Sequence, residues 1–181
     1  SPPAHPPPTP PEPGVFTTRA ALKTAVDGLP GSESTHGSIS GWDVSRVDDL
    51  SNVFLSKTTF NSELNWDTSK VTNMQYTFQG ATSFNQPLDW DTSSATTMQS
   101  LFAITQFNQH IDSWDVTKVT VRSGMSGRAF HGMFQHTPFS NDECKRQLTY
   151  ASFSQQSDAF DLAYGCQAYG CQDWSSAVCP S

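Results

Sequence analysis

Four aspartates recur along the chain at a constant interval, and carboxylate oxygens are preferred ligands of Ca²⁺. Each aspartate follows a tryptophan, and the four pairs are spaced 24 residues apart: Trp42-Asp43, Trp66-Asp67, Trp90-Asp91 and Trp114-Asp115. If successive repeats stack on one another, these carboxylates lie side by side and repel. A row of calcium ions would remove that repulsion, and so would basic side chains of the chain itself.

The residues that follow each aspartate favour a structural role over calcium binding. Arg46, Lys70 and Lys118 stand three residues after their aspartates, whereas Asp91 is followed at this position by Ser94. An Asp side chain also accepts backbone N–H groups in an Asx-turn with a following Ser or Thr. We therefore predict a turn-locking role for the four carboxylates, with a calcium ladder as the alternative.

Motifs for other chemistry are missing from the sequence. There is no Gly-x-Ser-x-Gly stretch, HExxH, phosphate loop or dinucleotide fingerprint, and the five histidines share no spacing. The net charge of −7 and the pI near 5.0 argue against a nucleic-acid partner. No apolar run reaches the roughly 20 residues that a membrane span requires. We predict a protein that is not an enzyme and that needs no cofactor and no metal.

The four cysteines lie near the end of the chain, at Cys144, Cys166, Cys171 and Cys179. An even number grouped in this way is typical of disulfide bonds formed in an oxidising compartment. A zinc site is the alternative, but no Cys-x-x-Cys pair occurs and no histidine follows Cys144. We expect two disulfides, with three pairings open. Together with a first residue, Ser1, that is not methionine, they favour an extracellular protein.

The 24-residue period also returns apolar residues to the same position in each repeat. One column holds the four tryptophans Trp42, Trp66, Trp90 and Trp114, and another holds Phe54, Phe78, Phe102 and Phe134, with an insertion around 121–128 in the fourth repeat. Too few residues of one repeat are apolar to form a core alone, so the repeats must stack. We expect an α/β repeat fold, a short right-handed solenoid of about four coils with helical caps at both ends. Each coil would contain one short parallel strand, near residues 70–74 in the second, and then a helical turn near 75–80.

Composition divides the chain into four parts. Residues 1–15 form a Pro-rich extended leader, and residues 16–41 contain a capping helix, expected over 16–28, and a first partial coil. Residues 42–139 form the repeat solenoid, and residues 140–181 form a disulfide-tied C-terminal cap. The two caps would shield the apolar ends of the array from water.

The stretch FNQPLDWDTSKVTNMQYTF resembles the repeat of BspA-like surface proteins, which are relatives of the leucine-rich repeats. The upstream stretch GSISGWDVSRVDDLSNVF is similar to the start of such arrays in secreted proteins of microbial eukaryotes. The resemblance covers residues 37–139, and the insertion in the fourth repeat departs from it. It implies a cell-surface, adhesive or matrix-type protein without a shared catalytic site.

The leader is the remaining candidate for a functional segment. Its prolines favour extended polyproline II, which docks on flat or aromatic surfaces at low entropic cost. The chain contains no Asn-x-Ser/Thr sequon, so any sugar would be O-linked, on the leader's Ser and Thr or on hydroxylated prolines. The candidate residues for assembly and glycosylation are Ser1, Pro2, Pro3, Pro6, Pro7, Pro8, Thr9, Pro10, Pro11 and Pro13.

These features predict a secreted structural protein that self-assembles into an extracellular filament or coat. In this homo-oligomer or polymer, the leader of one subunit lies along its neighbour in a contact that repeats rather than closes. The alternative is a monomeric cell-surface adhesion module that binds a glycan or a protein through one face of the solenoid.

Overall fold

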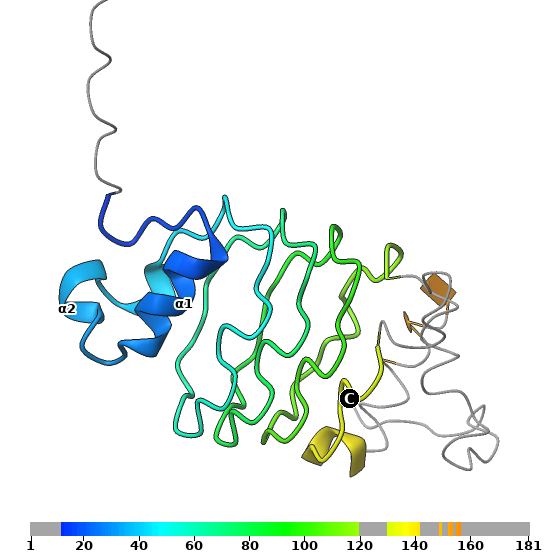
Figure 1. Cartoon of the computed structure of the whole chain (residues 1–181). Helices are drawn as coiled ribbons and strands as arrows, with labels where there is room; N and C mark the ends of the chain where they lie inside the picture. Colours follow the sequence, from blue (N-terminus) through cyan, green and yellow to red (C-terminus); the bar gives the residue numbers. More distant parts are fainter. Residues whose placement is uncertain (1–11, 120–129, 142–148, 150–151, 154, 157–181) are drawn as a thin grey trace, which may run out of the picture.

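The computed structural model describes residues 12–119, 130–141, 149, 152–153 and 155–156. Its elements in chain order are the helices α1 (Arg19–Asp27) and α2 (Glu33–His36) and the 3-10 helices η1 (Ile39–Gly41) and η2 (Pro138–Asn141). Between η1 and η2 the chain winds into coils that lie side by side in a stack, with α1 and α2 at the beginning of the stack (Figure 1). The tryptophan of each repeat marks the beginning of a coil.

Backbone hydrogen bonds from alternate residues join one coil to the next. The N–H groups of the first coil that donate to the second belong to Leu50, Asn52, Phe54 and Ser56. They bond the carbonyls of Asn73, Gln75, Thr77 and Gln79, with N···O distances of 2.9, 3.1, 2.8 and 2.8 Å. The second coil repeats the pattern toward the third from Met74, Tyr76, Phe78 and Gly80. Each coil therefore satisfies its backbone mainly through its neighbours, as expected when a repeat cannot fold alone.

The predicted α/β solenoid with one parallel strand per coil is wrong, because no β-strand occurs in the described part of the chain. Isolated parallel bridges stand there instead, between Val15 and Asp43, between Asp49 and Asn73, and between Asn73 and Thr97. The reason is that two residues of each coil have a positive φ, and a residue in the left-handed conformation interrupts the extended backbone that a strand requires. These residues are Asn52 and Ser56, Tyr76 and Gly80, Ser100 and Ile104, and Gly132 and His136.

The predicted helical turn near 75–80 is also wrong, for the same reason. Tyr76 and Gly80 have φ values of 58° and 71°, so this stretch consists of consecutive turns rather than a helix. The N–H groups of Gln79 and Ala81 bond back to the carbonyls of Tyr76 and Phe78 within the same coil. Successive turns of this kind let every second N–H point along the stack toward the next coil.

Two columns of phenylalanine fill the interior of the stack. In the first, Phe54, Phe78, Phe102 and Phe134 follow one another with ring centroids 5.1, 5.8 and 6.1 Å apart. Each of them also stacks on a second phenylalanine of its own coil, at 4.3, 4.0, 3.7 and 4.3 Å for Phe60, Phe84, Phe107 and Phe139. All of these rings except that of Phe60 are buried. Aromatic burial of this extent dominates the free energy of a small core.

The N-terminal segment covers the first coil. Helix α1 begins after Thr18, whose side-chain oxygen accepts the N–H of Ala21 at 3.2 Å, and it buries Leu22, Ala25 and Val26. The helix is shorter than the predicted 16–28 because residues 14–16 pair with the first coil instead. The N–H of Phe16 donates to the carbonyl of Asp43, and the N–H of Asp43 donates to that of Gly14, both at 2.8 Å.

Residues near 150 cover the last coil. The hydroxyl of Ser152 donates to the carbonyl of Asp112 at 2.6 Å, and the side-chain oxygen of Gln156 accepts the N–H of Val116 at 2.9 Å. The ring of Phe153 is buried and lies 6.0 Å from that of Phe130. Most of the predicted C-terminal cap, including its four cysteines, lies outside the described residues.

Candidate functional site

The aspartates that follow the tryptophans each close a short turn with one carboxylate oxygen. Their Oδ1 atoms accept the N–H of the residue two positions on: Ser45 at 2.9 Å, Ser69 at 3.0 Å, Ser93 at 2.9 Å and Thr117 at 2.9 Å. The hydroxyls of Ser69 and Thr117 also donate to the same oxygens, at 2.7 Å. This arrangement is an Asx-turn repeated at the same place in every coil.

The turns hold the four carboxylates in their charged form. The pKa values of Asp43, Asp67, Asp91 and Asp115 all lie below the ordinary value. The largest cause is the side chain of the Ser or Thr two residues on, followed by its backbone N–H. Hydrogen bonds to a carboxylate favour its ionised state, so the column carries negative charge at neutral pH.

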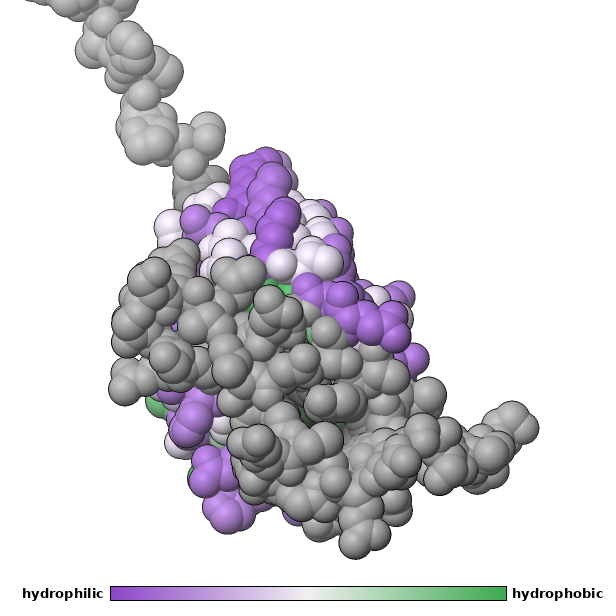
Figure 2. Space-filling view, turned by 90° about the vertical axis from the view of Figure 1, so that its right-hand side faces the viewer, coloured by the Kyte–Doolittle hydropathy of each residue, from purple (hydrophilic) through white to green (hydrophobic). Residues whose placement is uncertain are grey.

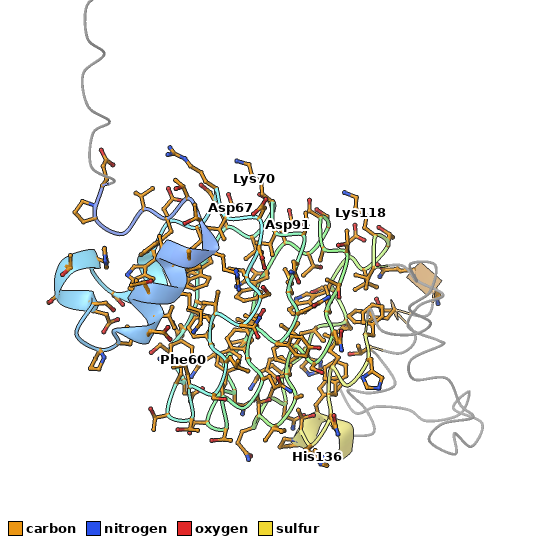
Figure 3. The ribbon with its side chains drawn as sticks, in the orientation of Figure 1. Phe60, Asp67, Lys70, Asp91, Lys118 and His136 are labelled. Atoms are coloured by element: carbon orange, nitrogen blue, oxygen red, sulfur yellow. The ribbon has the colours of Figure 1, made fainter. Side chains whose placement is uncertain are left out.

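Basic side chains lie near this column without contacting it. Coulombic attraction from Arg46 and Lys70 lowers the pKa of Asp43, and Lys118 acts in the same way on Asp115. However, these three cations take part in no ion pair among the residues that the structure describes. Figure 3 shows Lys70 and Lys118 along the same edge of the stack as Asp67 and Asp91, with both lysines directed away from the ribbon.

Asp91 differs from the other aspartates of the column because its own coil has Ser94 where the others have a cation. The Coulombic influences on it come from Asp67 and Asp115, which both raise its pKa against the effect of the turn. Within the described ranges, no group of three or more acidic, histidine or cysteine side chains is placed to hold a metal ion.

The tryptophans that precede these aspartates face the interior. Trp42, Trp66, Trp90 and Trp114 are buried, and the rings of Trp66 and Trp90 are stacked with centroids 6.3 Å apart. Their indole N–H groups donate to backbone carbonyls that lie earlier in the chain, those of Gly37, Ile39, Leu64 and Leu88. The dipeptide thus places an apolar anchor inside the stack and a charged turn on its edge.

Two further ladders follow from the structure. Thr68 and Thr92 come directly after an aspartate of the column. Their buried hydroxyls each donate a hydrogen bond to the backbone carbonyl of the next coil's aspartate, at 2.9 Å. On another edge, the side-chain oxygens of Asn61 and Asn85 accept the N–H groups of Asn85 and Asn108, at 2.9 and 2.8 Å. Sequence reasoning missed the threonine ladder, although Thr recurs directly after two aspartates of the column. The asparagines each follow a phenylalanine of the repeat, and this position had been interpreted as a backbone cap at a corner of the coil.

The cysteines and most of the leader lie outside the part of the chain that the structure describes. Ser1, Thr9 and seven of the leader prolines fall within residues 1–11, which lie outside the described residues, and so do the four cysteines at positions 144, 166, 171 and 179. Pro13 is described and exposed. The roles predicted for these residues stay predictions.

The fold and its charged edge define a repeat protein made of stacked 24-residue coils. The family described as "Mycoplasma protein of unknown function, DUF285" matches residues 21–141, and the chain belongs to this family. No curated protein and no solved structure matches the chain. Among the helices that the structure describes, none has the length and apolar character needed to cross a bilayer.

Proposed function

We propose that this protein is an extracellular structural protein whose copies assemble into a filament or coat, linked through the Pro-rich leader. The observation that carries this proposal is that the chain covers both ends of its own coil stack. Uncovered backbone edges are ready templates for pairing with another chain. Here the first coil bonds to residues 14–16, and the last coil bonds to Ser152 and Gln156. Copies therefore cannot join by pairing the ends of their stacks. The leader and the sides of the stack are the surfaces left for a contact between copies.

The residues that follow the leader are bonded into the N-terminal cap. The N–H of Gly14 donates to Nδ1 of His36 at 3.3 Å, and the buried ring of Phe16 lies 4.9 Å from that of Trp42. A neighbour that holds the leader would thus be coupled to the whole stack rather than to a loose tail. Polyproline II has few conformations to lose, which favours such docking.

The extracellular location rests on several features together. The repeats resemble those of BspA-like surface proteins, and the chain belongs to a family whose described function is unknown. Four cysteines near the chain end favour disulfides, and a segment rich in Pro with Ser and Thr favours O-linked sugar. Figure 2 supports a well-solvated module, because the described surface in this view is mostly hydrophilic. Among the described residues, Ile104, 47% exposed, is the one large apolar side chain on the surface.

The test is assembly of a shortened chain. We compare the full chain with a chain that begins at Glu12, because this start keeps the Glu12–Val15 turn and the contact between Gly14 and His36. Electron microscopy and sedimentation should show polymers for the full chain and particles of much lower mass for the shortened one. Circular dichroism and thermal unfolding serve as controls that the shortened stack is folded.

Two results would contradict the proposal. Identical filaments from both chains would mean that the leader is only a linker. Monomeric particles from the full native protein, together with binding to cells or to immobilised glycans, would favour the adhesion module instead.

A further inference from the structure

The side chain of His36 joins the residues that follow the leader to helix α2. His36 is the last residue of α2, and its Nδ1 accepts the N–H of Gly14 at 3.3 Å. Its ring also packs against the rings of Phe16 and Trp42, with centroids 5.3 and 5.9 Å away. We call this contact the histidine latch, and it consists of the His36 ring, the Gly14 N–H and the two aromatic rings.

The backbone of Gly14 is packed closely against the end of α2. Gly14 is buried and has a φ of 80°, and a Cβ added to it would lie 2.7 Å from the carbonyl oxygen of His36. Its own carbonyl accepts the N–H of Asp43 at 2.8 Å. The N–H of Gly14 is therefore a buried donor, and the partner that the described structure gives it is the ring of His36. A buried donor that loses its partner destabilises the structure around it.

The latch requires a neutral histidine. A ring nitrogen accepts a hydrogen bond only when it carries no hydrogen, so the contact with Gly14 places the hydrogen of the neutral ring on Nε2. In the protonated ring both nitrogens carry hydrogen, and turning the ring over brings no acceptor to Gly14. Two donors then face each other, and the Gly14 N–H is left without a partner. The side chain of His36 is half-buried, which leaves it open to protons from water.

The charged groups around the latch have other partners. The segments that pack against His36 carry three carboxylates, those of Glu12, Glu33 and Asp43, and none of them forms an ion pair with His36 among the described residues. Oε1 of Glu33 accepts the N–H of Ile39, and Oδ1 of Asp43 accepts that of Ser45, both at 2.9 Å. The cations of the cap and of the first coil lie with other carboxylates: Arg19 with Asp49, Lys23 and Lys57 with Asp27, and Arg46 near Asp43. The bond to Gly14 therefore decides what a proton on this ring does.

We propose that the histidine latch is a pH-sensitive switch, which holds residues 12–16 on α2 while His36 is neutral and releases them when it is protonated. Histidine ordinarily changes its charge between about pH 8 and pH 5, so the latch is closed at the upper end of this range and opens as the pH falls. The bonds between residues 14–16 and Asp43 do not involve the ring, so acid loosens the entry of the leader without removing the cap from the first coil. The switch acts on the leader's attachment to its own cap, whether or not the leader contacts a neighbouring copy.

Hydrogen exchange of the amides of residues 14–16 in the full chain tests this switch. The reference is H36N, because Oδ1 of asparagine takes the place of Nδ1 and accepts a hydrogen bond at any pH. The sequence around Gly14 is the same in both proteins, so the ratio of their exchange rates at each pH cancels the intrinsic effect of pH. We expect the wild-type rate, divided by that of H36N, to rise about tenfold between pH 8 and pH 5. The turn aspartates stay ionised throughout, because their pKa values lie below 3.8.

Two further variants serve as controls. H36F keeps a ring against Phe16 and Trp42 but has no acceptor, so its amides should exchange rapidly at every pH of the series. H110A removes a different histidine, whose Nδ1 lies 3.5 Å from Oδ1 of Asp112, and it should behave as the wild type does. Circular dichroism and thermal unfolding check that each variant is folded.

Several results would overturn the switch. A ratio of wild type to H36N that is constant from pH 8 to pH 5 would show that His36 does not open the latch. A rise that persists in H36F, or that vanishes in H110A, would assign the effect to another group. If H36N does not fold, the wild type is compared with H36F: the two rates should differ about tenfold at pH 8 and converge by pH 5, and an equal difference at both would contradict the proposal.

Discussion

At the scale of single residues, the aspartate of each repeat combines two tasks in one side chain. One oxygen closes a turn with the Ser or Thr two residues on, and the charge of the carboxylate remains exposed at the edge. A turn-locking asparagine would do the first task without the second. The choice of aspartate at all four positions is therefore consistent with a use for the charge itself.

Acid should weaken the fold through these aspartates. Because their pKa values are lowered in the folded protein, the stability that they contribute is present above the unfolded value of 3.8 and is lost as the pH falls through the folded values. In the variant D43N/D67N/D91N/D115N, urea midpoints should depend less steeply on pH between about 5 and about 2 than in the wild type. Equal slopes for the two proteins would show that the turns contribute nothing through ionisation.

The backbone of Ile104 is the second residue-scale feature with a measurable consequence. This β-branched residue has φ of 59°, at the position where the preceding coil has Gly80 with φ of 71°. A left-handed conformation costs such a residue on the order of 1–2 kcal/mol, whereas asparagine tolerates it.

Replacing Ile104 by asparagine should therefore stabilise the protein by about 0.5–1 kcal/mol in urea denaturation. The variant I104V is the control, because it keeps the β-branch and should show no gain. A loss of stability in I104N would mean that the half-exposed side chain makes a favourable contact that outweighs the strain.

At the scale of elements, side chains at the two ends of the stack form hydrogen bonds with backbone groups that would otherwise bond a neighbouring coil. Arg19 of α1 donates to the carbonyl of Ser51 at 3.2 Å in the first coil. In the last coil, Gln156 accepts the N–H of Val116 and donates to the carbonyl of Trp114. Side-chain amides carry a donor and an acceptor, so a single glutamine can satisfy backbone groups of both kinds.

Removing this glutamine should open the last coil locally. In Q156A the N–H of the buried Val116 loses its partner, which costs about 1–3 kcal/mol. Hydrogen exchange of that amide should accelerate, while amides near Met74 in the second coil should change little. The neighbouring variant Q155A is the control, since Gln155 is exposed. Unchanged exchange at Val116 would show that the cap is held by other contacts.

At the scale of the whole molecule, the phenylalanine columns couple the coils into one core. The ring of Phe78 lies within 4.0–5.8 Å of the rings of Phe54, Phe84, Phe102 and Trp90. Coils that share neighbours in this way stabilise one another, so a short stack unfolds as a unit.

A truncation in the middle of the core should thus affect every coil. We expect F78A to lower the free energy of unfolding by about 3–5 kcal/mol, because it leaves a cavity among four aromatic rings. The half-buried Phe60 is the comparison, and F60A should cost clearly less. Chemical denaturation measures both, and similar losses for the two variants would contradict a core centred on Phe78.

The sequence by itself determined the period, the columns and the identity of the turn residues. Tryptophans and phenylalanines that recur with the repeat have to share one interior, because these side chains are apolar and are buried together when the repeats stack. The aspartates were predicted to accept backbone N–H groups for a similar reason, since Ser or Thr follows each of them at a fixed distance. These inferences needed no knowledge of the backbone path.

Only the tertiary structure decided how the backbone runs between those columns. Every residue except proline has the same N–H and C=O groups, so the sequence does not say which of them bond across coils. Left-handed residues such as Tyr76 and Ile104 are not of a type that predicts such a conformation, and they turn the expected strand into a series of turns. The closure of the last coil likewise depends on Gln156, which lies 40 residues from Val116 and meets it only because the chain folds back over the stack.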